Sequence, residues 1–132
     1  MDSMVVWSVS EELPDRELQE MFTSVYGRPN RVDFQTILKN SLFWVSARNE
    51  DGTLIAFANV IWDGLYHALI VDRAALAHPS GDMKHEALLK VCDVLKERYP
   101  TVSKIHVECD EGEIPRLEPL GFERRTYGRL LW

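Results

Sequence analysis

The chain has 132 residues, of which 45% are hydrophobic and 27% charged, and its net charge is −6. This length and composition predict one globular domain over residues 1–132, with a core that needs no disulfide or metal. The acidic balance argues against a nucleic-acid partner, because phosphate-binding surfaces are normally basic. The apolar runs are too short to cross a membrane, and Cys92 and Cys109 fit no metal-ligand pattern. We therefore expect a cytoplasmic protein without a bound metal or a membrane segment.

The first forty residues predict one strand and two helices. Met4–Val9 is rich in β-branched and aromatic residues, which is typical of a strand. A helix is expected from Pro14 to Gly27, and a second one begins near Asp33. Their apolar faces carry Leu18, Met21, Phe22 and Val25 in the first helix, and Phe34, Ile37 and Leu38 in the second.

The hydrophobic period then changes from about four residues to two, which predicts a meander of three strands. The strands are Leu42–Arg48, Thr53–Trp62 and Leu65–Ala77, joined by tight turns at Asn49–Gly52 and Asp63–Gly64. The third strand is long enough that we expect a β-bulge within it.

The last third of the chain predicts a long helix followed by short elements. The helix covers Lys84–Tyr99, and its length allows a parallel crossover to a strand at Lys104–Cys109. A brief helix at Glu113–Leu120 precedes two final strands, Phe122–Arg125 and Tyr127–Trp132. The expected fold is α/β (α+β), with a mixed, mainly antiparallel central sheet and helices on both faces.

Several local motifs add to this order of elements. A strand ends in Leu76-Ala77-His78-Pro79, and a short loop leads to Ala87-Leu88-Leu89 in the long helix. Later, Ile105–Asp110, Glu113–Leu120 and Gly121-Phe122-Glu123 follow as strand, short helix and Gly-Phe step. Over nearly the whole chain this pattern resembles the GCN5-related N-acetyltransferase (GNAT) family.

The resemblance implies the acyl-CoA N-acyltransferase fold and direct transfer of acetyl from acetyl-CoA to an amine of a small molecule or peptide. The strands before and after the long helix would splay apart and hold the pantetheine arm. The pyrophosphate would lie at the N-terminus of that helix, where free N–H groups and the helix dipole favour anions. The residues expected to contact the cofactor are Leu76, Ala77, Ser80, Gly81, Met83, Lys84, His85 and Asp110.

The loop departs from the family pattern at most of its positions. Ser80, Met83 and His85 stand where the family has Gln or Arg, Gly, and Gly or Ala, and Gly81 is displaced. Asp82 would repel a phosphate and is better explained as a helix N-cap. Two alternatives remain open: a rearranged loop that binds CoA through Gly81, Lys84 and the helix end, or a loop that has lost this role.

The catalytic groups also differ from the family. Leu117 takes the place of the usual acid tyrosine, and Asp110 that of the usual asparagine. Tyr127 on a late strand, or Tyr66, could substitute for the acid, and Glu108 is the candidate base because it lies on the strand bordering the slot. In the alternative reading, the polar row that contains Glu108 faces solvent.

The leading hypothesis is an N-acetyltransferase. Its alternatives are a catalytically degenerate protein of the same fold, acting as a binding or assembly module, and an enzyme that uses another donor. The last strand could pair across a homodimer.

Overall fold

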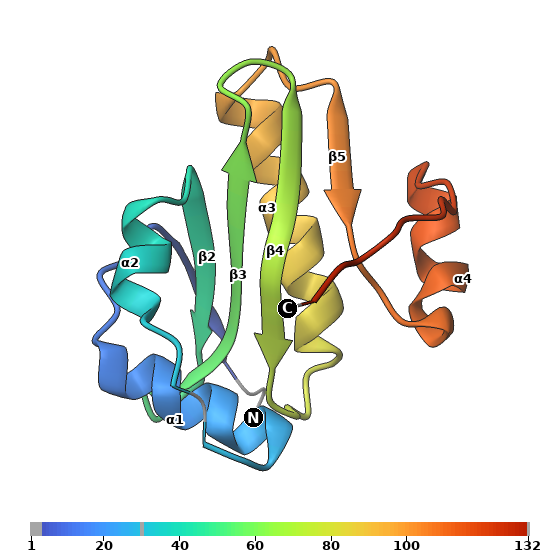
Figure 1. Cartoon of the computed structure of the whole chain (residues 1–132). Coiled ribbons are helices and arrows are strands. Elements are labelled where there is room, and N and C mark those ends of the chain that lie inside the picture. The colour runs from blue at the N-terminus through green and yellow to red at the C-terminus, as the bar shows by residue number, and fades with distance from the viewer. Residues whose placement is uncertain (1–3, 30, 132) are drawn as a thin grey trace.

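The computed structural model describes residues 4–29 and 31–131, and its centre is one five-stranded sheet (Figure 1). The strand order follows the sequence, with β1 to β4 antiparallel and β5 parallel to β4. This confirms the predicted mixed, mainly antiparallel sheet. The strands are β1 (Val6–Val9), β2 (Phe43–Arg48), β3 (Leu54–Trp62), β4 (His67–Ala75) and β5 (Lys104–Val107).

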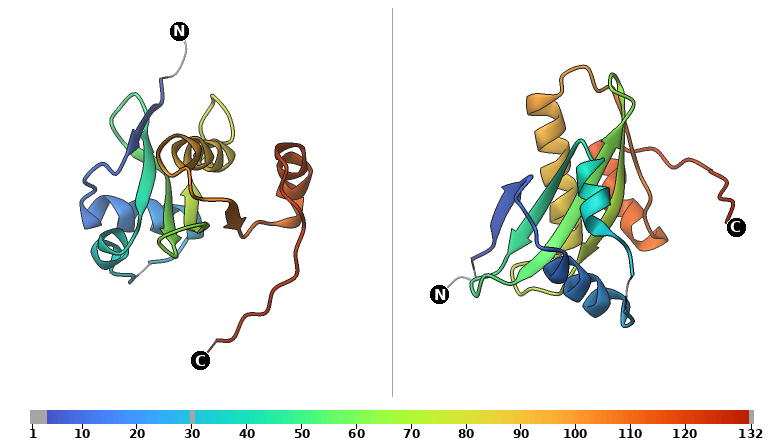
Figure 2. Two further views of the ribbon diagram at one scale, coloured as in Figure 1. Left: turned by 90° about the horizontal axis from the view of Figure 1, so that it is seen from above. Right: turned by 60° about the vertical axis from the view of Figure 1, so that its left-hand side comes forward.

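Helices cover both faces of the sheet, as predicted (Figure 2). α1 (Asp15–Tyr26) and α2 (Phe34–Lys39) pack on one face around Phe57, and α3 (Met83–Arg98) packs on the other around Ala58 and Val60. Successive residues of β3 therefore enter different cores, because side chains alternate between the two faces of a strand.

Local signals in the sequence set the helix ends. α1 ends at Gly27, whose φ of 70° gives the left-handed cap that favours glycine. α2 begins after Asp33, which accepts a hydrogen bond from the Thr36 N–H, and α3 begins after Asp82, which caps it in the same way.

The predicted bulge lies on β4. Ala58 is opposite Arg73 and Val60 is opposite Ile70, so that Asn59 alone faces Val71 and Asp72. The pairing of β4 with β5 ends at Ile70, whereas β4 itself continues to Ala75. The two strands therefore part at the bulge, and the chain after β5 turns away toward α4 (Figure 1).

The C-terminal region differs from the prediction. Phe122–Arg125 forms no strand, nor does Tyr127–Trp132 over its described part up to residue 131, while Trp132 lies outside the described residues. The segment has no alternating apolar face that could cover the core. Figure 2 shows it extending away from the sheet. The brief helix expected at Glu113–Leu120 is three consecutive short turns: η1 (Glu111–Glu113), α4 (Ile114–Leu117) and η2 (Glu118–Leu120).

Candidate functional site

The gap between β4 and the chain after β5 is a polar cleft of about 250 Å³. Its walls come from the end of α1, the bulge of β4, the first turn of α3 and the residues after β5. The lining residues are Tyr26, Val71, Asp72, Arg73, Lys84, Glu108, Cys109 and Asp110.

The bulge is held in place by a chain of hydrogen bonds that crosses the sheet. The Asp72 N–H donates to Asn59 Oδ1 at 2.8 Å, and Asn59 Nδ2 donates to Ser41 Oγ at 3.0 Å. The Ser41 hydroxyl in turn donates to the Ile37 carbonyl in α2 at 2.7 Å. Asn59 is fully buried, so these bonds satisfy an amide that would otherwise be costly in the core.

Asp72 is the carboxylate that the bulge presents to the cleft. It is half-buried, and this burial raises the pKa of its carboxyl group. A carboxylate with a raised pKa at the edge of a cleft is suited to accept a proton from a substrate. The sequence analysis missed Asp72. Its signal is the charged pair Asp72-Arg73 inside an otherwise apolar strand.

A buried ion pair beside the cleft joins β4 to the first turn after β5. Arg73 Nη1 lies 2.7 Å from Glu113 Oε2, with the two side chains 3% and 9% exposed, and Nη2 donates to Oε1 at 3.1 Å. The same guanidinium contacts the carbonyls of Lys84 and Glu108, each at 3.4 Å. Burial alone would raise the pKa of Glu113, but the hydrogen bond and charge of Arg73 lower it overall, with help from Lys84. This pair, which the sequence analysis also missed, ties the two walls together.

Glu108 and Tyr127, the predicted base and acid, lie in contact. The Tyr127 hydroxyl donates to Glu108 Oε1 at 2.6 Å, and this bond raises the pKa of the phenol. Both side chains are exposed, and Glu108 lines the cleft.

The predicted cofactor residues fall into two groups. Lys84 and Asp110 line the cleft beside Glu108. Met83 instead packs into the core with Ala47, Ile55 and Ala56. The others that do not line the cleft are Leu76, Ala77, Ser80, Gly81 and His85.

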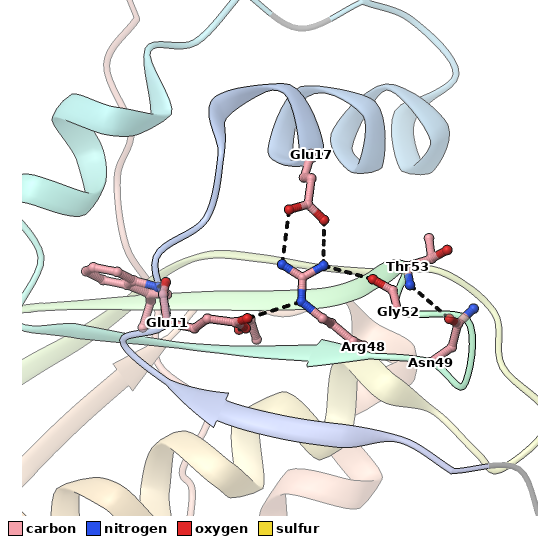
Figure 3. Close-up of polar contacts among 8 residues, drawn as sticks. Glu11, Glu17, Arg48, Asn49, Gly52 and Thr53 are labelled. Carbon is pink, nitrogen blue, oxygen red and sulfur yellow. Dashed lines mark hydrogen bonds and ion pairs between the residues drawn. The ribbon is translucent and has the colours of Figure 1, made fainter.

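A second hollow, of about 320 Å³, lies between α1 and the β2–β3 turn. Beside it Arg48 binds both carboxylate oxygens of Glu17, one oxygen of Glu11 and the Gly52 carbonyl (Figure 3). These bonds fasten α1 to the end of β2 and raise the pKa of Arg48. We interpret this cluster as a structural anchor.

The described residues contain no group of three or more metal-ligating side chains. No helix among them is long and apolar enough to span a bilayer.

The fold is shared with solved acetyltransferases. A provisionally named acetyltransferase from Deinococcus radiodurans R1 is 26% identical, with a TM-score of 0.72 over 96% of this chain and 87% of that one. A GNAT-family acetyltransferase from Streptococcus pneumoniae TIGR4 is 18% identical, with a TM-score of 0.70 and 98% of each chain covered. Glucosamine-6-phosphate N-acetyltransferase from Arabidopsis thaliana is 12% identical, with a TM-score of 0.67 over 96% of this chain and 98% of that one. No family model and no curated protein sequence matches the chain.

Proposed function

We propose that this chain, which has the fold of the GCN5-related N-acetyltransferases, is an acyl-CoA-dependent N-acyltransferase that moves acetyl from acetyl-CoA directly to an amine. The observation that carries the proposal is the parting of β4 and β5 beside a bulge that presents Asp72. A thioester placed in this opening would meet a base on one wall and the Glu108–Tyr127 pair on the other.

The transfer needs a base, an attack and a protonated leaving group. We assign Asp72 as the base that takes the proton from the substrate ammonium. The free amine then attacks the thioester carbonyl, the C–S bond breaks, and the leaving thiolate takes a proton from Tyr127, which Glu108 orients. The nitrogen of the new amide loses its second proton, which restores the Tyr127 hydroxyl. The predicted role of Glu108 as the base remains an alternative within the same cleft.

A covalent enzyme intermediate is not part of the proposal. Cys109 lines the cleft, but burial and the nearby charge of Glu113 raise the pKa of its thiol. A thiol in this state is a weak nucleophile, because the thiolate is the attacking species.

The acceptor side of the cleft favours a cationic amine. Asp72, Glu108 and Asp110 contribute three carboxylates, whereas the cations Arg73 and Lys84 are both held by Glu113. Such a surface attracts the ammonium form of a small molecule or of a peptide amine.

The alternative function is a binding or assembly module that has lost catalysis. The observation that favours it is that Arg73, the guanidinium lining the opening that the donor would enter, is already held by Glu113.

Calorimetry with CoA and a thiol-release assay with acetyl-CoA and a panel of primary amines test the proposal. We expect micromolar to millimolar binding of CoA and amine-dependent release of its thiol. Glu108→Gln and Tyr127→Phe should each slow transfer without abolishing CoA binding. Binding of CoA without transfer to any amine would favour the module, and the absence of both would refute the transferase.

A further inference from the structure

We infer that the donor is recognised through its thioester and pantetheine arm, and that the adenosine and pyrophosphate half of CoA adds little to binding. The inference rests on the proposed function and names the part of the donor that this site binds. It starts from the backbone N–H groups at the start of α3, which are the groups that a pyrophosphate would need.

In the loop before α3, backbone N–H groups donate hydrogen bonds within the loop itself. Gly81 N–H donates to the His78 carbonyl at 3.2 Å, and Ser80 N–H donates to His78 Nδ1 at 3.1 Å. His78 Nε2 lies 3.4 Å from Glu50 Oε2 in the β2–β3 turn, which fastens the loop to the sheet. The loop is therefore folded upon itself, and its donors are directed inward.

The first turn of α3 is occupied by a carboxylate of the chain. Asp82 Oδ1 accepts hydrogen bonds from the N–H groups of Lys84 and His85 at 3.1 and 3.2 Å. The Asp82 carbonyl accepts from Glu86 N–H at 3.0 Å. Asp82 thus takes the place where an anionic ligand would bind.

The three cations beside this turn share two carboxylates of the chain. Arg116 Nη2 lies 2.6 Å from Asp82 Oδ2. Lys84 Nζ lies 3.6 Å from Glu113 Oε1, and the same carboxylate holds Arg73. Burial would raise the pKa of Asp82, but the hydrogen bonds and charge of Arg116 and the N–H groups of the helix lower it overall. A pyrophosphate would have to displace two ionised carboxylates to gain these partners.

The cleft itself is open to a thioester and carries the proposed base, Asp72, and the proposed acid's partner, Glu108. Its walls at Asp72, Glu108 and Cys109 lie beyond the last paired residues of β4 and β5, apart from the closed loop. The ligand class that this arrangement fits is an acyl thioester on a pantetheine arm, with or without a nucleotide.

Binding measurements with three probes test the inference, namely CoA, pantetheine and adenosine 3′,5′-bisphosphate. We expect CoA and pantetheine to bind with dissociation constants within about fivefold of each other, and the bisphosphate to show no binding at millimolar concentration. In ¹⁵N NMR spectra, CoA should shift the amides of residues 71–73 and 108–110 and leave those of residues 80–82 unchanged. A hundredfold preference for CoA over pantetheine, or CoA-induced shifts centred on residues 80–82, would overturn the inference.

A variant at Asp82 tests whether this side chain keeps a phosphate away from the N-terminus of α3. Asp82→Gly frees the N–H groups of Lys84 and His85 and the charge of Arg116, so it should raise the preference for CoA over pantetheine at least tenfold. Asp33→Gly, the same change at the N-cap of α2, should leave the preference unchanged. An unchanged preference in Asp82→Gly would contradict the role of Asp82. Failure of both CoA and pantetheine to bind would instead refute the proposed function, and the inference with it.

Discussion

The half-buried carboxyl group of Asp72 lowers the stability of the folded protein when it is ionised. The backbone N–H of Asp72 is satisfied by Asn59, but within the described part of the chain its half-buried carboxyl group has no partner that lowers its pKa. Natural sequences keep such groups where activity needs them, and stability and activity then oppose each other. At the level of single residues, this makes Asp72 the most informative position to change.

Asp72→Asn should slow amine acetylation about 100-fold or more, because it removes the base. It should also stabilise the protein at neutral pH. The raised pKa means that the folded state binds more protons than the unfolded state above an ordinary aspartate pKa of about 4. The free energy of unfolding of the parent protein therefore falls as pH rises through this window, and the variant escapes that loss.

Urea unfolding at pH 3 and pH 7, together with kcat/KM, checks this prediction. The variant should be more stable than the parent at pH 7 and gain nothing at pH 3, where the parent carboxyl is protonated in both states. Asp93→Asn, at an exposed position of α3, is the matched control and should change neither quantity. A variant that is less stable at pH 7 would contradict the burial argument.

At the scale of elements, the Arg73–Glu113 pair joins β4 to η1 beside the cleft. Removing one member of a buried pair leaves an uncompensated charge, whereas replacing both by apolar groups is often neutral. We therefore expect the free energy of unfolding to differ between single and double variants of this pair.

Glu113→Gln should lower the free energy of unfolding by about 3–5 kcal/mol, because Arg73 then lacks its counterion. The double variant Arg73→Met, Glu113→Leu should recover most of this loss. Glu111→Gln, two residues away, is the control: its partner Arg124 and its own side chain are largely exposed, so we expect a change below about 1 kcal/mol. Denaturant unfolding measures all three, and a single variant as stable as the parent would show that the pair does not hold the walls together.

Most elements could be predicted from the sequence because local signals define them. The period of Leu18, Met21 and Phe22 predicted α1, and the turn at Asn49–Gly52 predicted the β2–β3 hairpin. The Arg73–Glu113 pair could not be predicted, since 40 residues separate its members and only the crossover through α3 brings them together. The final strands were wrong for the opposite reason: a local pattern of aromatic residues was present without a face that a core could bury.

At the scale of the whole molecule, β5 is an outer strand of the sheet, and the segment after Phe122 contacts the rest of the chain through the Tyr127–Glu108 and Arg124–Glu111 side-chain pairs. β5 pairs only with β4, which leaves its other edge open. The extended segment after Phe122 carries Leu130 and Leu131, which are 78% and 74% exposed. It also carries three arginines, of which Arg124 pairs with Glu111 and Arg125 with Glu123 of the same chain. An open edge and an extended segment with exposed leucines suit each other in a second copy of the chain.

We therefore predict a homodimer in which this segment pairs with β5 of the partner, as the sequence analysis expected for the last strand. Light scattering coupled to gel filtration at about 100 µM should give the mass of a dimer. The double change Leu130→Asp, Leu131→Asp should convert it to a monomer. It would replace two apolar side chains by carboxylates, which the acidic residues after β5 would repel. Leu65→Asp is the control: this leucine is equally an exposed apolar residue, but it lies in the β3–β4 turn, away from β5's open edge. A parent protein that elutes as a monomer at this concentration would refute the pairing, and so would a double variant that remains dimeric.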